Sequence, residues 1–454
     1  MRLLISTAAL LVLLLFFGCS TDADDAAPTP VVAPTRTAIA TPTVLATGEA
    51  PAPVHHTFAP GATIDVQDAG IFFVDIETGA AEGWVTPGSA DNPFAFRVSG
   101  MSADGSRLIY DCARPAVGRV QPCGGRAEDP FAYYLFDTAT GERTRLDAFT
   151  GEFVTLSPDG EMILGMTSRG LARAGVTQPD DVEIIDLLAE DSTLPHRAVW
   201  APDGEAVAVS LGVNGYPSTA VWILRFNGAA PVELVHGGAY PATWSSDGTK
   251  IGLLDQIKSG MWVYDDRGLL LWTRADPISN AQWSPDGRLL AISINPGQES
   301  EEPERIEMVD SATGEAQYRI VAALGCGSRI WNAGGSLLLF GSYANEGRMV
   351  VADPAERTYA ATDSYWLMPS PDDPELAIVF DGEAFESFDL MEQQRTGVIA
   401  RTASHPAWFF DHPPFFAGGR IVFTSPHLGH GGCGEAGSGI TTKPEPRFEF
   451  PPFE

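Results

Sequence analysis

Lysine is scarce in this chain of 454 residues, which contains only Lys250, Lys258 and Lys443. Acidic residues number 59 against 28 basic ones, so the formal net charge is −31. A surface of this charge repels nucleic acid and anionic lipid, and we expect neither as a partner. The acidity is interpreted as a solvated surface, with attraction of cations or basic proteins as the alternative.

Apolar runs long enough to span a bilayer are also missing, since the run "LLISTAALLVLLLFF" at 3–17 is shorter than the roughly 20 residues required. Arg2 precedes this run, and Gly18 and Cys19 follow it. The pattern resembles a bacterial lipoprotein signal peptide, here residues 1–18, in which Cys19 is lipidated. The resemblance implies an extracytoplasmic protein of the cell envelope, anchored in the membrane through its N-terminal lipid. An ordinary signal peptide or membrane anchor is the alternative.

The next segment, residues 19–60, is rich in threonine, proline and alanine and has no amphipathic period. Such a composition favours extended, semi-rigid conformations, so we predict a tether without a fold of its own. Repeats occupy residues 65–425, and residues 426–454 form a Gly/Pro-rich tail that lacks a strand pattern.

Cysteines are few, and the four that remain after Cys19 are an even number, which suits disulfides outside the cytoplasm. Cys112 and Cys123 flank a polar loop and are predicted to close it. Cys326 and Cys433 then remain as a second predicted disulfide. Free buried thiols are the alternative for both pairs.

One five-residue motif recurs in the chain as "MSADG", "LSPDG", "WAPDG", "WSSDG" and "WSPDG". An apolar run follows each copy, so the pattern predicts strand, tight turn, strand. The aspartate can accept hydrogen bonds from turn N–H groups, and glycine supplies positive φ. We therefore predict structural rather than catalytic roles for the repeated turn residues Asp104, Gly105, Asp159, Gly160, Asp203, Gly204, Asp247, Gly248, Asp286 and Gly287.

A second strand–turn–strand unit follows each motif, which makes four antiparallel strands per repeat. These second units are residues 133–146, 182–191, 220–235, 261–273 and 306–320. The motifs are spaced by 55, 44, 44 and 39 residues. Periods of about 40–45 residues with four strands each are typical of β-propeller blades.

Degenerate copies at 330–342, 366–380 and 407–425 extend the series. The last has no second unit after it, whereas residues 71–86 are a second unit with no first unit before them. We predict that residues 71–86 pair with 404–424 and close the ring, which removes exposed sheet edges. The count is then eight blades, with seven as the alternative.

These repeats resemble the TolB-like (WD40-like) β-propeller repeat, which has an aromatic residue, Ser-Pro-Asp-Gly and then an apolar strand. The resemblance implies an all-β propeller and is weak evidence for any activity.

Motifs of propeller-bearing enzymes are absent. No Gly-x-Ser-x-Gly nucleophile elbow occurs, and glycine follows the motif aspartate directly, unlike the Ser-x-Asp-x-Gly boxes of sialidases. We predict no catalytic residues and no cofactor.

Metal sites have only weak support in the sequence. His427, His430 and Cys433 lie at intervals of three and could ligate zinc, but a Gly-rich, solvent-facing loop is the preferred interpretation. The acidic run 297–307 could bind calcium, although a solvated loop is again preferred.

Phenylalanine gathers late in the chain, at Phe409, Phe410, Phe415 and Phe416 and again in the tail. Either the tail folds onto the closing blade and buries these rings, which we prefer, or they form a partner surface.

The leading hypothesis from sequence is a non-catalytic, lipid-anchored propeller that binds a protein, peptide or glycan. A lyase or hydrolase with residues scattered around the central funnel is the alternative, and a purely structural envelope component is a third.

Overall fold

The computed structural model describes most of the repeat region. The described residues are 54–64, 69–86, 95–116, 119–122, 133–150, 153–185, 193–213, 220–236, 238–255, 260–296, 300, 302–322, 324, 330–341, 348–362, 364, 366–380, 384–402, 415–425 and 447–449. The chain divides into two units, Met1–Ala46 and Thr47–Glu454, and all described residues belong to the second. The predicted signal peptide and most of the predicted tether lie outside the described residues.

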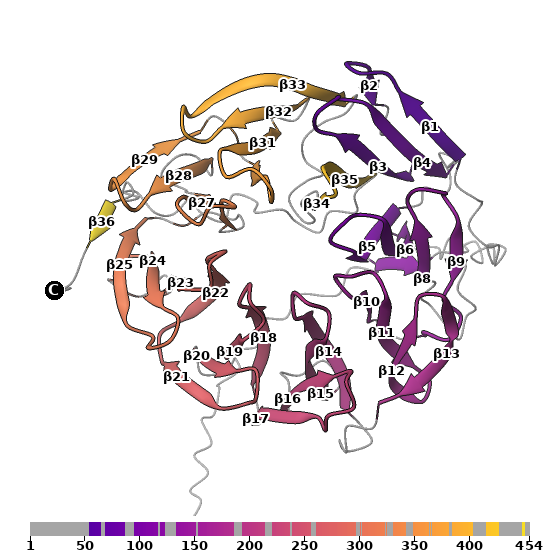
Figure 1. The fold of residues 1–454 in the computed structure, drawn as a ribbon, viewed down its shortest axis with the longest axis horizontal. Coiled ribbons are helices and arrows are strands. Elements are labelled where there is room, and N and C mark those ends of the chain that lie inside the picture. The colour runs from indigo at the N-terminus through magenta and orange to yellow at the C-terminus, as the bar shows by residue number, and fades with distance from the viewer. Residues whose placement is uncertain are drawn as a thin grey trace, which may run out of the picture. The chain divides into compact units, whose positions relative to one another are not determined.

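Eight antiparallel sheets are arranged around one centre, and they form an eight-bladed β-propeller (Figure 1). The prediction of an all-β propeller with eight blades is confirmed. No helix in the described part of the chain is long and apolar enough to cross a membrane.

Seven blades are each built from one continuous stretch of chain, with the first strand innermost. Blade 1 contains β5 (Ala95–Met101), β6 (Arg107–Ala116), β8 (Tyr133–Asp137) and β9 (Arg143–Arg145), and β7 (Arg119–Pro122) pairs with β6. Blade 2 contains β10 (Val154–Leu156), β11 (Met162–Thr167), β12 (Gly170–Gly175) and β13 (Gln178–Ile184). Blade 3 contains β14 (Thr193–Trp200), β15 (Ala206–Val213), β16 (Ala220–Arg225) and β17 (Val232–His236).

The same order continues around the ring. Blade 4 contains β18 (Ala239–Trp244), β19 (Lys250–Asp255), β20 (Gly260–Asp265) and β21 (Leu270–Arg274). Blade 5 contains β22 (Ile278–Trp283), β23 (Leu289–Ile294), β24 (Arg305–Asp310) and β25 (Ala316–Val321). Blade 6 contains β26 (Ile330–Trp331), β27 (Leu338–Gly341), β28 (Met349–Asp353) and β29 (Thr358–Ala361). Blade 7 contains β30 (Trp366–Pro369), β31 (Leu376–Phe380), β32 (Ala384–Asp389) and β33 (Gln394–Thr402).

Blade 8 closes the ring because it combines both ends of the repeat region. Its inner strands, β34 (Phe415–Ala417) and β35 (Arg420–Ser425), come from the C-terminal side. Its next strands, β3 (Ala69–Asp75) and β4 (Ala81–Thr86), come from the N-terminal side. β3 and β35 pair antiparallel from Gly70↔Ser425 to Asp75↔Arg420. The predicted closure by the N-terminal hairpin is confirmed.

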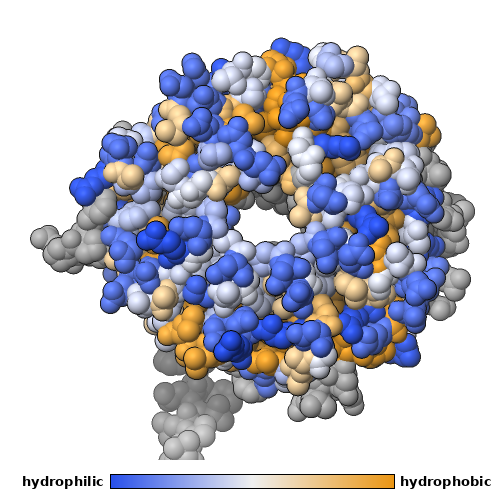
Figure 2. Space-filling model, in the orientation of Figure 1, coloured by the Kyte–Doolittle hydropathy of each residue, from blue (hydrophilic) through white to orange (hydrophobic). Residues whose placement is uncertain are grey.

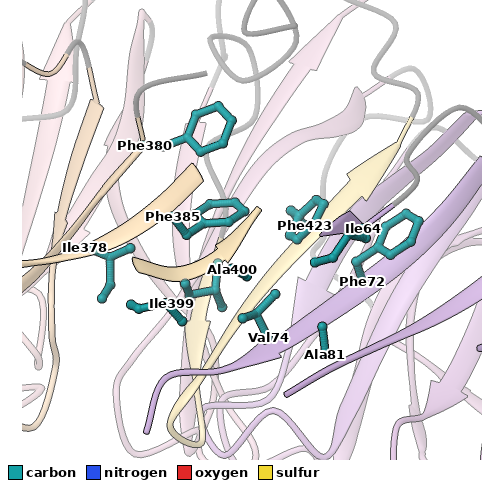
Figure 3. Packing of buried hydrophobic residues seen from close by; sticks show 11 residues of the cluster. Ile64, Phe72, Val74, Ala81, Ile378, Phe380, Phe385, Ile399, Ala400 and Phe423 are labelled. Carbon is teal, nitrogen blue, oxygen red and sulfur yellow. The ribbon is translucent and has the colours of Figure 1, made fainter. Parts of the chain in front are cut away.

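The core beside this closure contains side chains from three separate parts of the chain (Figure 3). Phe72 of β3 and Phe423 of β35 are paired across the ladder, and their rings stack with centroids 5.2 Å apart. Phe385 of blade 7 lies on the other side of Phe423, at 5.3 Å. The same cluster therefore joins the two chain ends to each other and to the preceding blade.

Glycines on β3 and β4 make room for the Phe72 ring. Gly83 lies directly opposite Phe72 in the ladder, and a methyl group there would lie 2.7 Å from the ring. At Gly70 a methyl group would lie 2.9 Å from it. These glycines sit in strand interiors, where glycine otherwise weakens a sheet, because the aromatic side chain covers them.

Three outer blade edges are extended by strands from the chain ends. β1 (Val54–Phe58) pairs with β4 of blade 8, and β2 (Thr63–Ile64) pairs in parallel with β33 of blade 7. β36 (Arg447–Glu449) pairs antiparallel with β25 of blade 5. β1 lies within the segment that the sequence analysis assigns to the tether.

The tail strand corrects the prediction that residues 426–454 lack a strand and, for Arg447–Glu449, the prediction that the tail folds onto the closing blade. β36 docks on blade 5 instead, because Phe448 packs against the core between blades 5 and 6. Arg319 of β25 forms an ion pair with Glu449. One apolar residue between two charged ones is too short a pattern to reveal a strand from sequence.

The second half of blade 2 is also misplaced by the sequence analysis. The predicted unit at 182–191 overlaps only the end of β13, and the hairpin is instead β12 and β13 at 170–184. β13 alternates between exposed and half-buried residues, with polar Gln178, Asp180 and Asp181 on it, so it lacks the apolar run used to recognise other strands.

Candidate functional site

The turns that carry the repeated motif are held by the motif aspartates. In "WSPDG", Asp286 Oδ1 accepts hydrogen bonds from Ser284 Oγ at 2.6 Å and from Arg288 N at 3.0 Å. Gly287 has φ = 68°, in the left-handed region that favours glycine. The motif carboxylate therefore accepts hydrogen bonds from residues of its own turn.

The other copies repeat this arrangement. Asp104 Oδ1 accepts from Ser102 Oγ and Ser106 N, and Asp247 Oδ1 accepts from Ser245 Oγ and Thr249 N. In the Asp203 turn, Ala201 stands where the other copies have serine, and Asp203 Oδ1 accepts from Glu205 N. In the degenerate copy of blade 6, Asn332 Oδ1 accepts hydrogen bonds from Ser336 N and Leu337 N in the same way.

Neighbouring turns contact each other around the ring. Ala103 N donates to Pro158 O of the next blade, and Ser246 Oγ donates to Pro285 O at 2.6 Å. A methyl group on Gly204 would lie 3.1 Å from Asp159 Oδ2. Tight turns of neighbouring blades thus contact each other on this face.

Three of the motif carboxylates, Asp104, Asp247 and Asp286, have lowered pKa values. For Asp104, the hydrogen bond from Ser102 is the largest influence and lowers the pKa. For Asp247 and Asp286, burial is the largest influence and raises the pKa, but hydrogen bonds from Ser245 and Ser284 and from the backbone outweigh it. The charged form of each side chain is the one that the turn stabilises.

This arrangement predicts loss of stability in acid. A carboxylate whose folded pKa lies below the unfolded value of about 3.9 stabilises the fold above that pH, and the contribution disappears as the pH falls through the folded pKa. We expect the melting temperature to fall as the pH drops below about 4. The triple variant D104N/D247N/D286N should show a shallower fall over the same pH series. A wild-type melting temperature that stays flat from pH 6 to 2.5 would contradict this role.

The inner strands surround a central opening, which Figure 2 shows at the middle of the ring. Tryptophans link neighbouring inner strands, because Trp244 Nε1 donates to Val199 O and Trp283 Nε1 donates to Thr243 O. Arg197 is exposed on β14, and its guanidinium lies 5.1 Å from the centroid of the Tyr240 ring on β18. Among the described residues, this cation–π contact joins two inner strands, and Lys250 of β19 makes another with the inner-strand Trp283, at 5.9 Å.

The two faces of the propeller differ in the length of their connections. On the face with the motif turns, all sixteen connections have six residues or fewer. On the opposite face, eight of the connections between strands of the eight four-stranded blades have seven residues or more, and the longest of these, between β6 and β8, has 16 residues including β7. We call these the turn face and the loop face. Long connections on a rigid scaffold are where binding residues concentrate.

An ion network stands at the loop face between blades 4 and 5. Glu307 of β24 is 4% exposed, and its carboxylate binds Arg305 Nε at 2.7 Å and Arg274 Nη2 at 2.8 Å. Asp276 lies 2.8 Å from Arg274, and Glu302 lies 3.2 Å from Arg305. Burial, the largest single influence, raises the pKa of Glu307. The hydrogen bonds and positive charges of Arg274 and Arg305 together lower it by more, so the pKa of Glu307 lies below its usual range.

This network corrects the interpretation of the acidic run 297–307 as a solvated loop for the end of the run, which lies in β24, whereas residues 300, 302 and 303 are exposed. Glu302 and Glu307 pair with arginine, and Glu304 Oε2 accepts from Leu324 N at 2.6 Å. Sequence patterns did not predict the part of Arg274 and Asp276, which lie 23 and 21 residues before the run and meet it only through blade packing. Among the described residues, no group of three His, Cys, Asp or Glu side chains could hold a metal ion.

Most other predicted site residues cannot be placed. Cys19, Cys123, Cys326, Cys433, Phe409, Phe410, His427 and His430 lie outside the described residues. Cys112 lies on β6, whose ladder with β7 ends at Ala113↔Pro122, directly beside Cys112 and Cys123 in sequence. The disulfides remain predictions. Phe415 lies on β34, and Phe416 is half-buried against the closure core.

By its fold, then, the chain is an eight-bladed β-propeller protein with a tightly turned face and a loop face. No protein-family model and no curated protein matches the sequence.

Several solved structures have a similar fold. Dihydro-heme d1 dehydrogenase NirN in complex with DHE has a TM-score of 0.50 and 13% identity, covering 78% of this chain and 78% of that chain. A putative TolB from Agrobacterium tumefaciens has a TM-score of 0.37 and 16% identity, covering 79% and 99%. An oligogalacturonate lyase in complex with manganese has a TM-score of 0.42 and 16% identity, covering 71% and 94%. At such identities the likeness concerns the fold alone.

Proposed function

We propose that this protein is a lipid-anchored, extracytoplasmic binding module that holds a protein or peptide partner against its loop face. The observation that carries the proposal is the difference between the two faces, because short turns join the strands on one side of the ring and longer connections join them on the other. The anchor is inferred from the signal-like residues before Cys19.

Binding is preferred to catalysis for a physical reason. The buried carboxylate of Glu307 at the loop face is paired with Arg274 and Arg305. Paired groups of this kind position a surface and its neighbouring connections, whereas a general acid or base needs a pKa near the working pH. The net charge of −31 favours a partner with basic residues.

Exchange of one connection on each face tests the proposal. Residues 403–414, which join β33 to β34 on the loop face, are replaced by a Gly/Ser segment of equal length. The control replaces residues 227–230, an exposed turn of the turn face in blade 3. Both variants are used as bait for envelope membranes, and recovered proteins are quantified by mass spectrometry. We expect a partner that the loop-face variant loses at least tenfold and the control retains.

The anchor is tested separately in cells. Cys19→Ala should move the protein out of the membrane fraction while recombinant binding stays unchanged. A protein that stays in the membrane after this substitution contradicts lipidation, and equal recovery of all partners by both exchange variants contradicts binding at the loop face.

A further inference from the structure

Three consecutive leucines are exposed at the outer rim of blade 4. Leu269, Leu270 and Leu271 are 65%, 44% and 36% exposed. Leu269 ends the turn after β20, and the other two begin β21. Figure 2 shows hydrophobic surface on the rim in the region of β17 and β21, and Val232 and Leu234 of β17 lie beside the turn at Gly268. This set of five apolar residues is called the blade 4 patch.

The patch lies on an unpaired strand edge. β21 is the last strand in its sheet, and among the described residues no strand pairs with its outer side. Soluble proteins usually blunt such edges with charge or proline, as β13 does with Pro179, Asp180 and Asp181. The leucines of β21 instead leave an unpaired edge that is apolar and not protected by charge or proline at these positions.

Other blades of the same ring already accept an additional strand at this position. β1, β2 and β36 add to the outer strands β4, β33 and β25. The outer edge of a blade is therefore geometrically able to bind an extended segment.

Blade 5 provides the direct comparison for blade 4. The outer strand of each blade has a bulge: in blade 4 it lies opposite Val263 and Tyr264, and in blade 5 opposite Met308 and Val309. When the two bulges are aligned, Leu270 and Leu271 of β21 correspond to Ala316 and Gln317 of β25. β36 binds just beyond that bulge, and its Phe448 packs inward. Where blade 5 has a small and a polar residue just before the residues that pair with its added strand, blade 4 has two leucines.

We propose that β21 binds an extended segment of a partner protein, apolar with basic flanking residues, as a fifth strand of blade 4. Open backbone N–H and C=O groups need hydrogen bonds that hydrocarbon cannot supply, which favours a peptide over a membrane. A second copy of this chain would bring a like charge of −31, which favours a basic segment over self-association. This surface is on the rim and is independent of the loop face.

A synthetic peptide with a central run of valines and lysines at both ends serves as the probe, with the mature full-length protein. Affinity is measured by fluorescence anisotropy, and hydrogen exchange reports protection of residues 270–274. The variant L270K/L271K is compared with M391K/V398K, which adds the same charge at two exposed apolar positions of blade 7, 58% and 46% exposed. L270S/L271S is the second variant, and all are checked by melting temperature.

We expect both leucine variants to bind the peptide at least tenfold more weakly, the blade 7 variant to bind like wild type, and peptide to protect the amides of β21. Equal affinity of all variants, or no protection at β21, overturns the proposal. It is also overturned if the leucine variants instead lose binding to phosphatidylcholine vesicles, or convert a dimer to a monomer, with peptide affinity unchanged.

Discussion

Replacing Phe72 with alanine is expected to lower the free energy of unfolding by about 3–5 kcal/mol, the usual range for a buried phenylalanine. The side chain is fully buried, stacks on Phe423 and covers Gly70 and Gly83. Its loss leaves a cavity at the place where the N-terminal strands meet the C-terminal ones. Urea unfolding at constant pH measures the change.

Phe149→Ala is the matched control, because Phe149 is equally buried but lies in the core of blades 1 and 2. Both variants should lose comparable stability. Only Phe72→Ala should accelerate hydrogen exchange in β3 and β35, since only that residue joins the chain ends. Equal acceleration in the two variants would mean that Phe72 has no particular part in closure.

Replacing Glu307 with alanine is expected to cost about 3–5 kcal/mol, because the change leaves Arg274 and Arg305 without the carboxylate that they share in a buried site. Glu183→Ala is the control, since Glu183 pairs with Arg173 but is largely exposed, and such pairs contribute about 0–1 kcal/mol. The two costs are compared by urea unfolding at pH 7.

The Glu307 effect should depend on pH in one direction. The folded pKa of Glu307 is lowered, so its contribution is present above the unfolded value of about 4.3 and disappears as the pH falls through the folded pKa. The difference in free energy of unfolding between wild type and Glu307→Ala should therefore become smaller in acid. A difference that grows as the pH falls would contradict the ion network.

Local patterns in the sequence were sufficient to predict the ring. The five-residue motif encodes its own turn, because aspartate, glycine and the apolar strand after them act within a few residues. The closing hairpin followed from counting half-repeats, with residues 71–86 matching the incomplete last copy.

Features that depend on contacts between blades could not be predicted in this way. Arg274 and Glu307 meet only because blades 4 and 5 pack side by side. β36 has a single apolar residue, and its partner strand is 130 residues away. β13 in blade 2 has no apolar run that would predict a strand from sequence. Its place in the blade is defined by its pairing with β12.

Cleavage of the chain between β4 and β5 tests most directly whether the two ends of the repeat region share one blade. A protease site is inserted within residues 87–94, and a second protein carries the same site within residues 30–45 of the tether. After cleavage at 87–94, the fragment containing β1, β3 and β4 should co-elute with the rest of the chain in native gel filtration and separate only in denaturant, whereas the tether fragment should separate at once. A fragment with β3 and β4 that dissociates under native conditions would contradict the closed ring.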